Sequence, residues 1–233
     1  MRAFETEKTE IAEVDRSVYD IKDKVNAAFE VNSGLTAEIV EQISKEKHDP
    51  DWMREFRLKA LDIYNKASIP NWGPSLEGLD MRNIVTYVRP NTEMRGKWSE
   101  VPDDIKNTFE RLGIPQAERS SLAGVGAQYD SEVVYHNVKE EVAAQGVVYT
   151  DMESALTGPY ADMVKEHFMK CVPPTDHKFA ALHGAVWSGG SFVYVPAGVH
   201  VDIPLQSYFR LNAPGAGQFE HTLIIVDKGA YLH

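Results

Sequence analysis

Four residues in the last part of the sequence carry side chains that bind metal ions in proteins: His200, Glu220, His221 and His233. A mononuclear site normally draws three or four such ligands from neighbouring strands. Glu220 and His221 are adjacent, so on a strand they would face opposite sides of the sheet. These residues are therefore weak metal candidates, and we expect no complete ligand set within this chain.

A proline–alanine–glycine–valine–histidine run at residues 196–200 resembles the glycine turn followed by histidine that occurs in cupin-type barrels. Cupin sites use a His-x-His pair followed by glutamate, whereas position 202 is aspartate. A cupin-like metal-dependent enzyme is therefore kept as an alternative function and not as the first choice.

Cys171 is the only cysteine, so an intrachain disulfide is excluded and a reducing compartment is indicated. It lies near a predicted helix end, before Pro173 and Pro174. Structural cysteines are usually buried and behave as small apolar residues, and the local sequence shows no group that would activate the thiol. We therefore expect Cys171 to be buried.

Four other polar or glycine residues have ordinary structural interpretations. By its sequence alone, Arg210 is typical of a surface arginine on a strand edge. Asn212 precedes an alanine–proline–glycine run and is typical of a turn. Gly124 and Gly126 do not form a dinucleotide-binding fingerprint, because position 129 is tyrosine and strand-like sequence follows; we expect a structural turn there.

The elements that position these residues divide into a helical front and a β-rich back. Apolar side chains recur at helical spacing over residues 35–48, 52–64 and 102–112. Asp49 followed by Pro50 predicts an N-cap and a first helical position.

From residue 178 onward we expect short strands with glycine-rich corners, typical of a β-helix, a jelly roll or a barrel. The sequence shows no strict internal repeat that would choose among them. The predicted strands cover residues 185–187, 191–195, 199–205, 207–211 and 218–226.

Composition limits the classes of function. A formal net charge of −11 argues against nucleic-acid binding, which needs clustered lysine and arginine. No apolar run approaches the roughly 20 residues of a membrane span, and the first residues have neither a secretory nor a transit-peptide character. We therefore expect a cytoplasmic protein.

Five segments, taken in order, resemble the SufBD family of iron–sulfur cluster assembly scaffolds. The resemblance covers nearly the whole chain after the first thirty residues, and its anchors are residues 70–74, 124–137, 146–151, 196–206 and 208–212. It implies an α+β fold in which an α-rich N-terminal domain precedes the first coils of a right-handed parallel β-helix. We accordingly expect a flexible arm at 1–32, an α-rich domain at 33–145 and a truncated β-helix core at 146–233.

The same resemblance implies a role and a set of partners. Proteins of this family act as scaffolds, not enzymes, that accept sulfur and build a nascent cluster for transfer to apo-proteins. The implied partners are a SufD-like subunit, a SufC-like ATPase, and a cysteine desulfurase with its sulfur carrier. A reduced flavin is also implied, and the family's cysteines and terminal cluster ligands would lie beyond His233. A truncated interaction module without cluster chemistry is a further alternative.

Arg210 and Asn212 match family positions that point inside the β-helix and belong to a sulfur-transfer path. The terminal sulfur of a persulfide is anionic near neutral pH, and a guanidinium with an amide donor would stabilise it. Alternation along a strand predicts that both side chains lie on one face.

Overall fold

The computed structural model describes residues 27–111 and 122–233 and has a mixed α+β architecture, as the sequence predicts. Residues 1–26, most of the expected arm, lie outside the described residues. The described helices are α1 (Ala37–Glu46), α2 (Asp51–Lys66), the short 3-10 helix η2 (Trp98–Glu100), α3 (Asp103–Arg111), α5 (Glu140–Ala143), α6 (Met152–Thr157), α7 (Ala161–His167) and α8 (Lys178–Val186). The described strands are β1 (Ala27–Glu30), β2 (Val88–Pro90), β3 (Gly124–Tyr129), β4 (Glu132–Val138), β5 (Val148–Asp151), β6 (Ser191–Val195), β7 (His200–Val201), β8 (Leu205–Arg210), β9 (Leu223–Val226) and β10 (Tyr231–Leu232).

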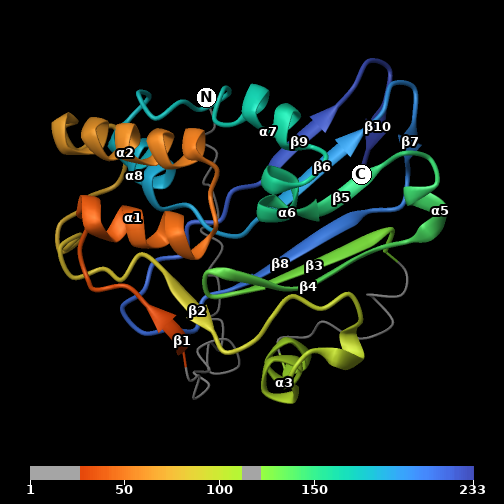
Figure 1. Cartoon of the computed structure of the whole chain (residues 1–233), viewed down its shortest axis with the longest axis horizontal. Coiled ribbons are helices and arrows are strands. Elements are labelled where there is room, and N and C mark those ends of the chain that lie inside the picture. The colour runs from red at the N-terminus through yellow and green to blue at the C-terminus, as the bar shows by residue number, and fades with distance from the viewer. Residues whose placement is uncertain (1–26, 112–121) are drawn as a thin grey trace, which may run out of the picture.

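Helices α1, α2 and α8 lie together at one end of the molecule, which we call the helical layer (Figure 1). The predicted apolar faces of α1 and α2 meet there around Ile39, Ile43 and Ala60, all nearly inaccessible to solvent. The prediction that Asp49 is the N-cap of α2 is wrong, because Pro50 occupies that position and makes no side-chain hydrogen bond. Asp49 instead turns inward, and its carboxylate accepts a hydrogen bond from Arg57.

Helix α8 replaces the strand predicted at residues 185–187. Six of its nine residues are buried, and both α2 and α1 pack against it. A helix that is apolar all round shows no 3.6-residue stripe, so periodicity could not reveal it. Among the described helices, none is long and apolar enough to cross a membrane.

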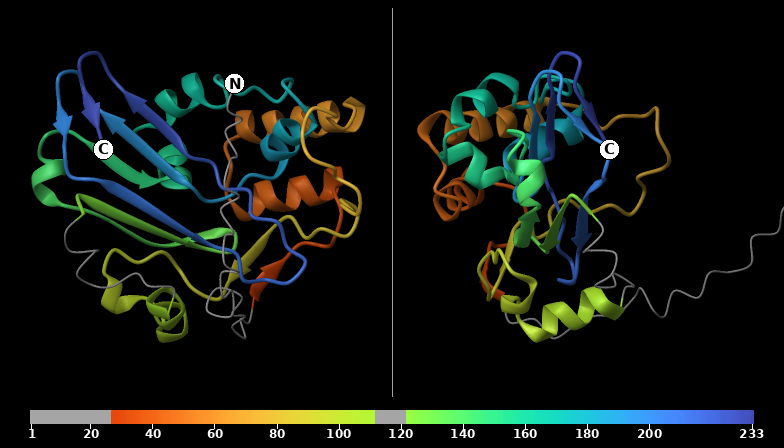
Figure 2. Two further views of the ribbon diagram at one scale, coloured as in Figure 1. Left: turned by 180° about the vertical axis from the view of Figure 1, so that it is seen from behind. Right: turned by 90° about the vertical axis from the view of Figure 1, so that its right-hand side faces the viewer.

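Two three-stranded sheets form the β-rich part, with strand orders β4-β3-β8 and β5-β6-β9. In both, the middle strand pairs antiparallel on one side and parallel on the other. Helix α3 lies beside the β3–β4 hairpin, and its apolar face packs on that sheet through Ile105 and Phe109 (Figure 2). The first sheet joins strands from both sides of the domain boundary expected at residue 145, because β8 pairs with β3.

Strands β6 and β7 stack on β9 and β10 with a constant offset, and we call these four strands the stacked strands. Phe192 pairs with Leu223 and His200 with Tyr231, so each partner lies 31 residues further along the chain. The corners between the strands stack too, because Gly198 donates its N–H to the carbonyl of Lys228 at 3.1 Å. The sequence shows no strict repeat because few of the stacked residues are identical, Val195 with Val226 and Gly198 with Gly229 being two that are.

Candidate functional site

Arg210 and Asn212 lie at the end of β8, where the chain leaves the sheet. Arg210 pairs with Tyr129 of β3, so it shares a face of the sheet with Tyr129 and Tyr208 and not with Ser207. The strand ends at Arg210, and Asn212 is buried in the following turn. Side-chain alternation along β8 therefore does not include Asn212. Another contact must bring Arg210 and Asn212 together.

That contact is Asp130, the first residue of the two-residue turn between β3 and β4. Its N–H donates to the carbonyl of Arg210 at 2.8 Å, and its Oδ1 accepts from the N–H groups of Asn212 at 2.7 Å and Ala213 at 2.9 Å. Its carbonyl accepts from the side chain of Gln218 at 2.7 Å. We call Asp130, Arg210, Asn212 and Gln218 the Asp130 cluster.

Two opposing effects act on the carboxyl of Asp130. Burial raises its pKa above the ordinary value for aspartate, since only 1% of the residue is exposed. The N–H groups of Ala213 and Asn212 and the positive charge of Arg210 act in the other direction, because they stabilise the ionised form. Both residues that the sequence selected thus act on one buried carboxyl.

Gly124 and Gly126 are part of strand β3, so the predicted turn is wrong. A Cβ at Gly126 would lie 2.9 Å from the Tyr149 hydroxyl, which means that the missing side chains make room for this ring. The hydroxyl of Tyr149 lies 2.7 Å from Oγ of Ser207. Ser207 in turn lies 2.8 Å from Ser191, giving a chain of hydroxyl groups between the two sheets. Position 126 excludes a side chain because this hydroxyl chain occupies the space.

The candidate metal ligands do not come together. His200 is exposed on β7, and Glu220 accepts a hydrogen bond from Thr222 at 2.9 Å. His221 turns inward, where its Nδ1 lies 2.8 Å from Nε2 of His183. Within the described part of the chain, no three histidine, cysteine, aspartate or glutamate side chains group around one point. The described strands form separate small sheets, so the cupin-like alternative gains no support.

Cys171 is exposed, so the prediction of a buried thiol is wrong. Helix α7 ends at His167, and Cys171 lies in the irregular segment that follows, on the wall of a cavity of about 500 Å³. His183 and His221 line the same cavity. Burial lowers the pKa of His183 to about 4 and that of His221 to about 3, and the positive charge of Arg57 adds to both shifts.

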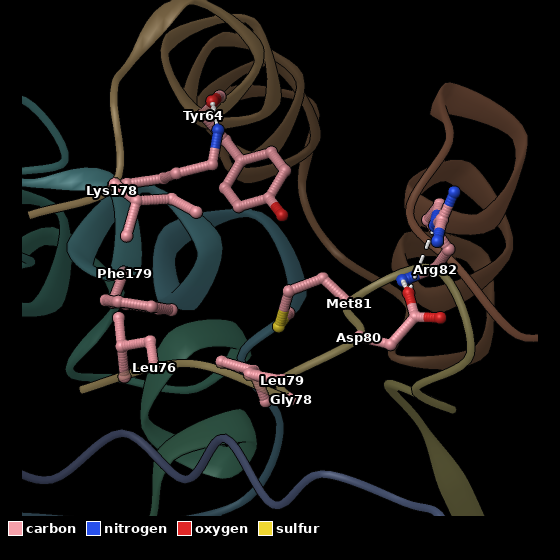
Figure 3. A pocket seen from close by; sticks show the side chains of 10 residues that line it. Tyr64, Leu76, Gly78, Leu79, Asp80, Met81, Arg82, Lys178 and Phe179 are labelled. Atoms are coloured by element: carbon pink, nitrogen blue, oxygen red, sulfur yellow. Dashed lines mark hydrogen bonds and ion pairs between the residues drawn. The ribbon is translucent and has the colours of Figure 1, made fainter.

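A second cavity, of about 360 Å³, lies between the end of α2, the loop at residues 76–82 and the start of α8 (Figure 3). Its two cations already have protein partners. Lys178 donates to the carbonyl of Tyr64 at 2.7 Å, and Arg82 lies 3.1 Å from Asp80. The cavity therefore offers mainly apolar surface to a ligand, without a free cation among the residues that line it.

Sequence reasoning missed Asp130, although it lies within the run 124–137 that the resemblance singled out. Its backbone φ is +52°, a left-handed conformation that is uncommon outside glycine, asparagine and aspartate. The available signal was an aspartate between two strand-like runs, which by itself predicts only a turn. Its burial and its contact with residue 212 depend on β8 lying next to β3.

Comparison with known proteins places this α+β chain with stacked parallel strands among iron–sulfur assembly proteins. Residues 37–207 match the family model described as the SufBD protein N-terminal region. The chain is 54% identical over 215 residues to the iron–sulfur cluster assembly protein SufB of Bacillus subtilis, covering 92% of this chain and 46% of that protein. It is 49% identical over 229 residues to the SufBD family protein Mb1496 of Mycobacterium bovis, covering 98% of this chain and 27% of that protein.

A third relative, the SufBD family protein SH2035 of Staphylococcus haemolyticus, is 50% identical over 215 residues and is covered to 46% of its length. The chain therefore belongs to the SufBD family, and it spans about half or less of the length of these relatives.

Proposed function

We propose that this chain is the N-terminal part of a scaffold subunit on which iron–sulfur clusters are assembled and then passed to apo-proteins. The observation that carries the proposal is the match of residues 37–207 to the N-terminal region of SufBD proteins. The scaffold would work in the cytoplasm with a SufD-like subunit, a SufC-like ATPase, and a cysteine desulfurase with its sulfur carrier. It would hold sulfur and iron, and the ATPase would drive the conformational change.

Arg210 and Asn212 would stabilise sulfur in transit. In a persulfide transfer, an acceptor thiolate attacks the outer sulfur, the donor S–S bond breaks and the donor thiolate leaves, so the electrons balance without an added reductant. The anionic outer sulfur needs a positive partner where water is scarce, and a guanidinium provides one. The position of Arg210 at the half-buried end of a strand and the burial of Asn212 support this role.

The scaffold itself would be a right-handed parallel β-helix. The constant 31-residue offset from β6 to β9 and from β7 to β10 supports this fold, since stacked coils require equal spacing between paired strands. The domain division at residue 145 and the reduced flavin also remain parts of the proposal. The cavity of Figure 3 does not fit the phosphate of a flavin cofactor, because Lys178 and Arg82 are already engaged, and we derive no step through a flavin.

The test is cluster assembly by the intact gene product, purified with its SufD-like and SufC-like partners. Iron, cysteine, the desulfurase and a thiol reductant, which supplies the two electrons that convert each persulfide sulfur to sulfide, are added, and the visible circular dichroism of the cluster is followed. We expect Arg210→Ala to reduce the assembly rate by about tenfold or more, because loss of one charge-assisted hydrogen bond corresponds to at least about 1.4 kcal/mol. Arg54→Ala is the matched control, since Arg54 is an exposed arginine paired with Glu41.

Three results would contradict the proposal in different ways. Failure to associate with the ATPase would contradict the scaffold role. Equal rates for the parent complex and Arg210→Ala would contradict the sulfur path. Pairing with the SufD-like subunit, with no cluster formed and no dependence on Arg210, would favour an interaction module.

A further inference from the structure

Asp130 occupies a position that glycine would fill with less strain. It is the first of two residues joining β3 to β4, and its φ of +52° lies in the left-handed region. Two-residue hairpin turns favour glycine or asparagine at such positions, because their backbone reaches positive φ more easily. An aspartate that is both left-handed and buried costs stability in two ways, through its conformation and through its desolvated charge.

Both backbone polar groups of this aspartate are hydrogen-bonded. Its N–H binds the carbonyl of Arg210, and its carbonyl accepts from the amide side chains of Gln128 at 3.0 Å and Gln218 at 2.7 Å. A glycine could make these same backbone bonds. What aspartate adds at this position must therefore come from its side chain.

The carboxylate supplies what glycine lacks. Its Oδ1 fixes two successive N–H groups, those of Asn212 and Ala213, and so holds the turn immediately after Arg210. Its Oδ2 is buried and has no hydrogen-bond partner among the described residues. Burial disfavours the ionised form of this carboxyl, and the two N–H groups together with the positive charge of Arg210 favour it. One residue fixes the backbone on both sides of the Arg210–Asn212 segment and balances its charge.

We propose that Asp130 is the positioning residue of the sulfur path, holding the Arg210–Asn212 segment through its Oδ1 and orienting the Arg210 guanidinium through its negative charge. This inference rests on the proposed role of Arg210 in sulfur transfer, and it adds a residue from a different strand to that site. Asp130 does not contact the sulfur; it acts through Arg210 and Asn212.

Asp130→Asn separates the two parts of this role. Asparagine tolerates left-handed φ and keeps an Oδ1 acceptor for the two N–H groups, but it removes the charge. We expect the variant to fold, to shift the NMR resonance of the Arg210 Nε–Hε group, and to lower the assembly rate about tenfold, as Arg210→Ala does. The double variant should be no slower than either single variant, because both changes disable the same group.

The matched control is Asp227→Asn, an exposed turn aspartate whose Oδ1 accepts from the N–H of Lys228 at 2.6 Å. It should leave the Arg210 resonance and the assembly rate unchanged. If Asp130→Asn does not fold, the Asp130 carboxyl can be titrated by ¹³C NMR in otherwise native protein. Replacing Arg210 by alanine should then raise the titration midpoint of Asp130, because a stabilising positive charge is lost.

An unchanged Arg210 resonance in Asp130→Asn, a midpoint that does not move in Arg210→Ala, or additive losses of assembly rate would each overturn the proposal. Failure of the sulfur path is distinguishable from these results. In that case Arg210→Ala would assemble clusters at the parent rate, while the NMR measurements would still report whether Asp130 holds Arg210.

Discussion

The helical layer and the stacked strands bury their polar groups in opposite ways. In the helical layer, Arg57 and Asp49 form an ion pair at 2.6 Å with neither side chain exposed, and Arg57 also binds the carbonyl of Trp187 at 2.9 Å. The stacked strands instead rely on backbone bonds between parallel strands, and they leave Ile224 and Val226 on the surface. The stability of the helical layer depends on a few specific charges. The stability of the stacked strands depends on many similar backbone hydrogen bonds.

A second charge cluster joins the helical layer to the sheets. Lys47, at the end of α1, binds Glu132 of β4 at 2.9 Å and Glu153 of α6 at 2.7 Å. Burial by itself would lower the pKa of Lys47, but the negative charges of Glu153 and Glu132 outweigh it and raise the value. We therefore expect single substitutions to lower the free energy of unfolding most in the helical layer and least at the edge of the stacked strands.

The largest effect is expected at the buried ion pair. Arg57→Ala should lower the free energy of unfolding by about 3–5 kcal/mol, because it leaves the buried carboxylate of Asp49 without its partner. The measurement is urea unfolding of the purified chain. Replacing both partners, as Arg57→Met with Asp49→Leu, should recover much of the loss; a double variant as unstable as the single one would show that the charge is not the cause.

A pH effect of similar or slightly smaller size is expected where the two regions meet. The pKa of His183, about 4, lies below the 6.5 of an unfolded histidine, so the unfolded chain binds more protons in this range. The contribution of neutral His183 to the free energy of unfolding is fully present above about pH 6.5. It is lost as the pH falls towards 4, and the total loss is about 3 kcal/mol.

His183→Gln should therefore reduce the slope of unfolding free energy against pH between 6.5 and 4, measured by urea titrations at each pH, and His221 should retain a contribution of its own. The exposed His200→Gln serves as the control and should leave the slope as in the parent chain. An unaltered slope in His183→Gln would mean that other groups cause the acid sensitivity.

At the corners of the stacked strands, two equivalent substitutions should have equal and smaller effects. Gly198 and Gly229 have φ values of 72° and 69°, and a Cβ at either would meet no atom within 4 Å. Alanine at each position should cost about 1–2 kcal/mol from backbone strain alone, as measured by thermal unfolding. Clearly unequal losses of stability would show that the two corners are not equivalent.

The smallest effect is expected at Cys171. Because the thiol is exposed, Cys171→Ser should change the unfolding free energy by less than about 0.5 kcal/mol. A thiol reagent should label the native chain at one site, without prior unfolding. Labelling that waits for denaturant would show that the thiol is covered in solution.

Three helices, α1, α2 and α3, could be predicted because each of them buries one face. Their apolar residues recur at helical spacing, and a solvent-exposed opposite face preserves that pattern. Helix α8 could not be predicted in the same way because it is buried almost all round. In the candidate site, resemblance selected Arg210 and Asn212, whereas Asp130 shows no distinguishing local pattern beyond that of a turn residue.

By itself, the sequence determined the mixed α+β class, the positions of the one-sided helices and the membership of the SufBD family, because periodicity and segment identity are local properties. Only the tertiary structure decided that Asp49 pairs with Arg57 instead of capping α2, that Gly126 makes room for Tyr149, and that Asp130 meets the end of β8. These outcomes depend on strands and helices far apart in the chain. A buried polar group must find a partner wherever packing places one, and no local pattern encodes where that will be.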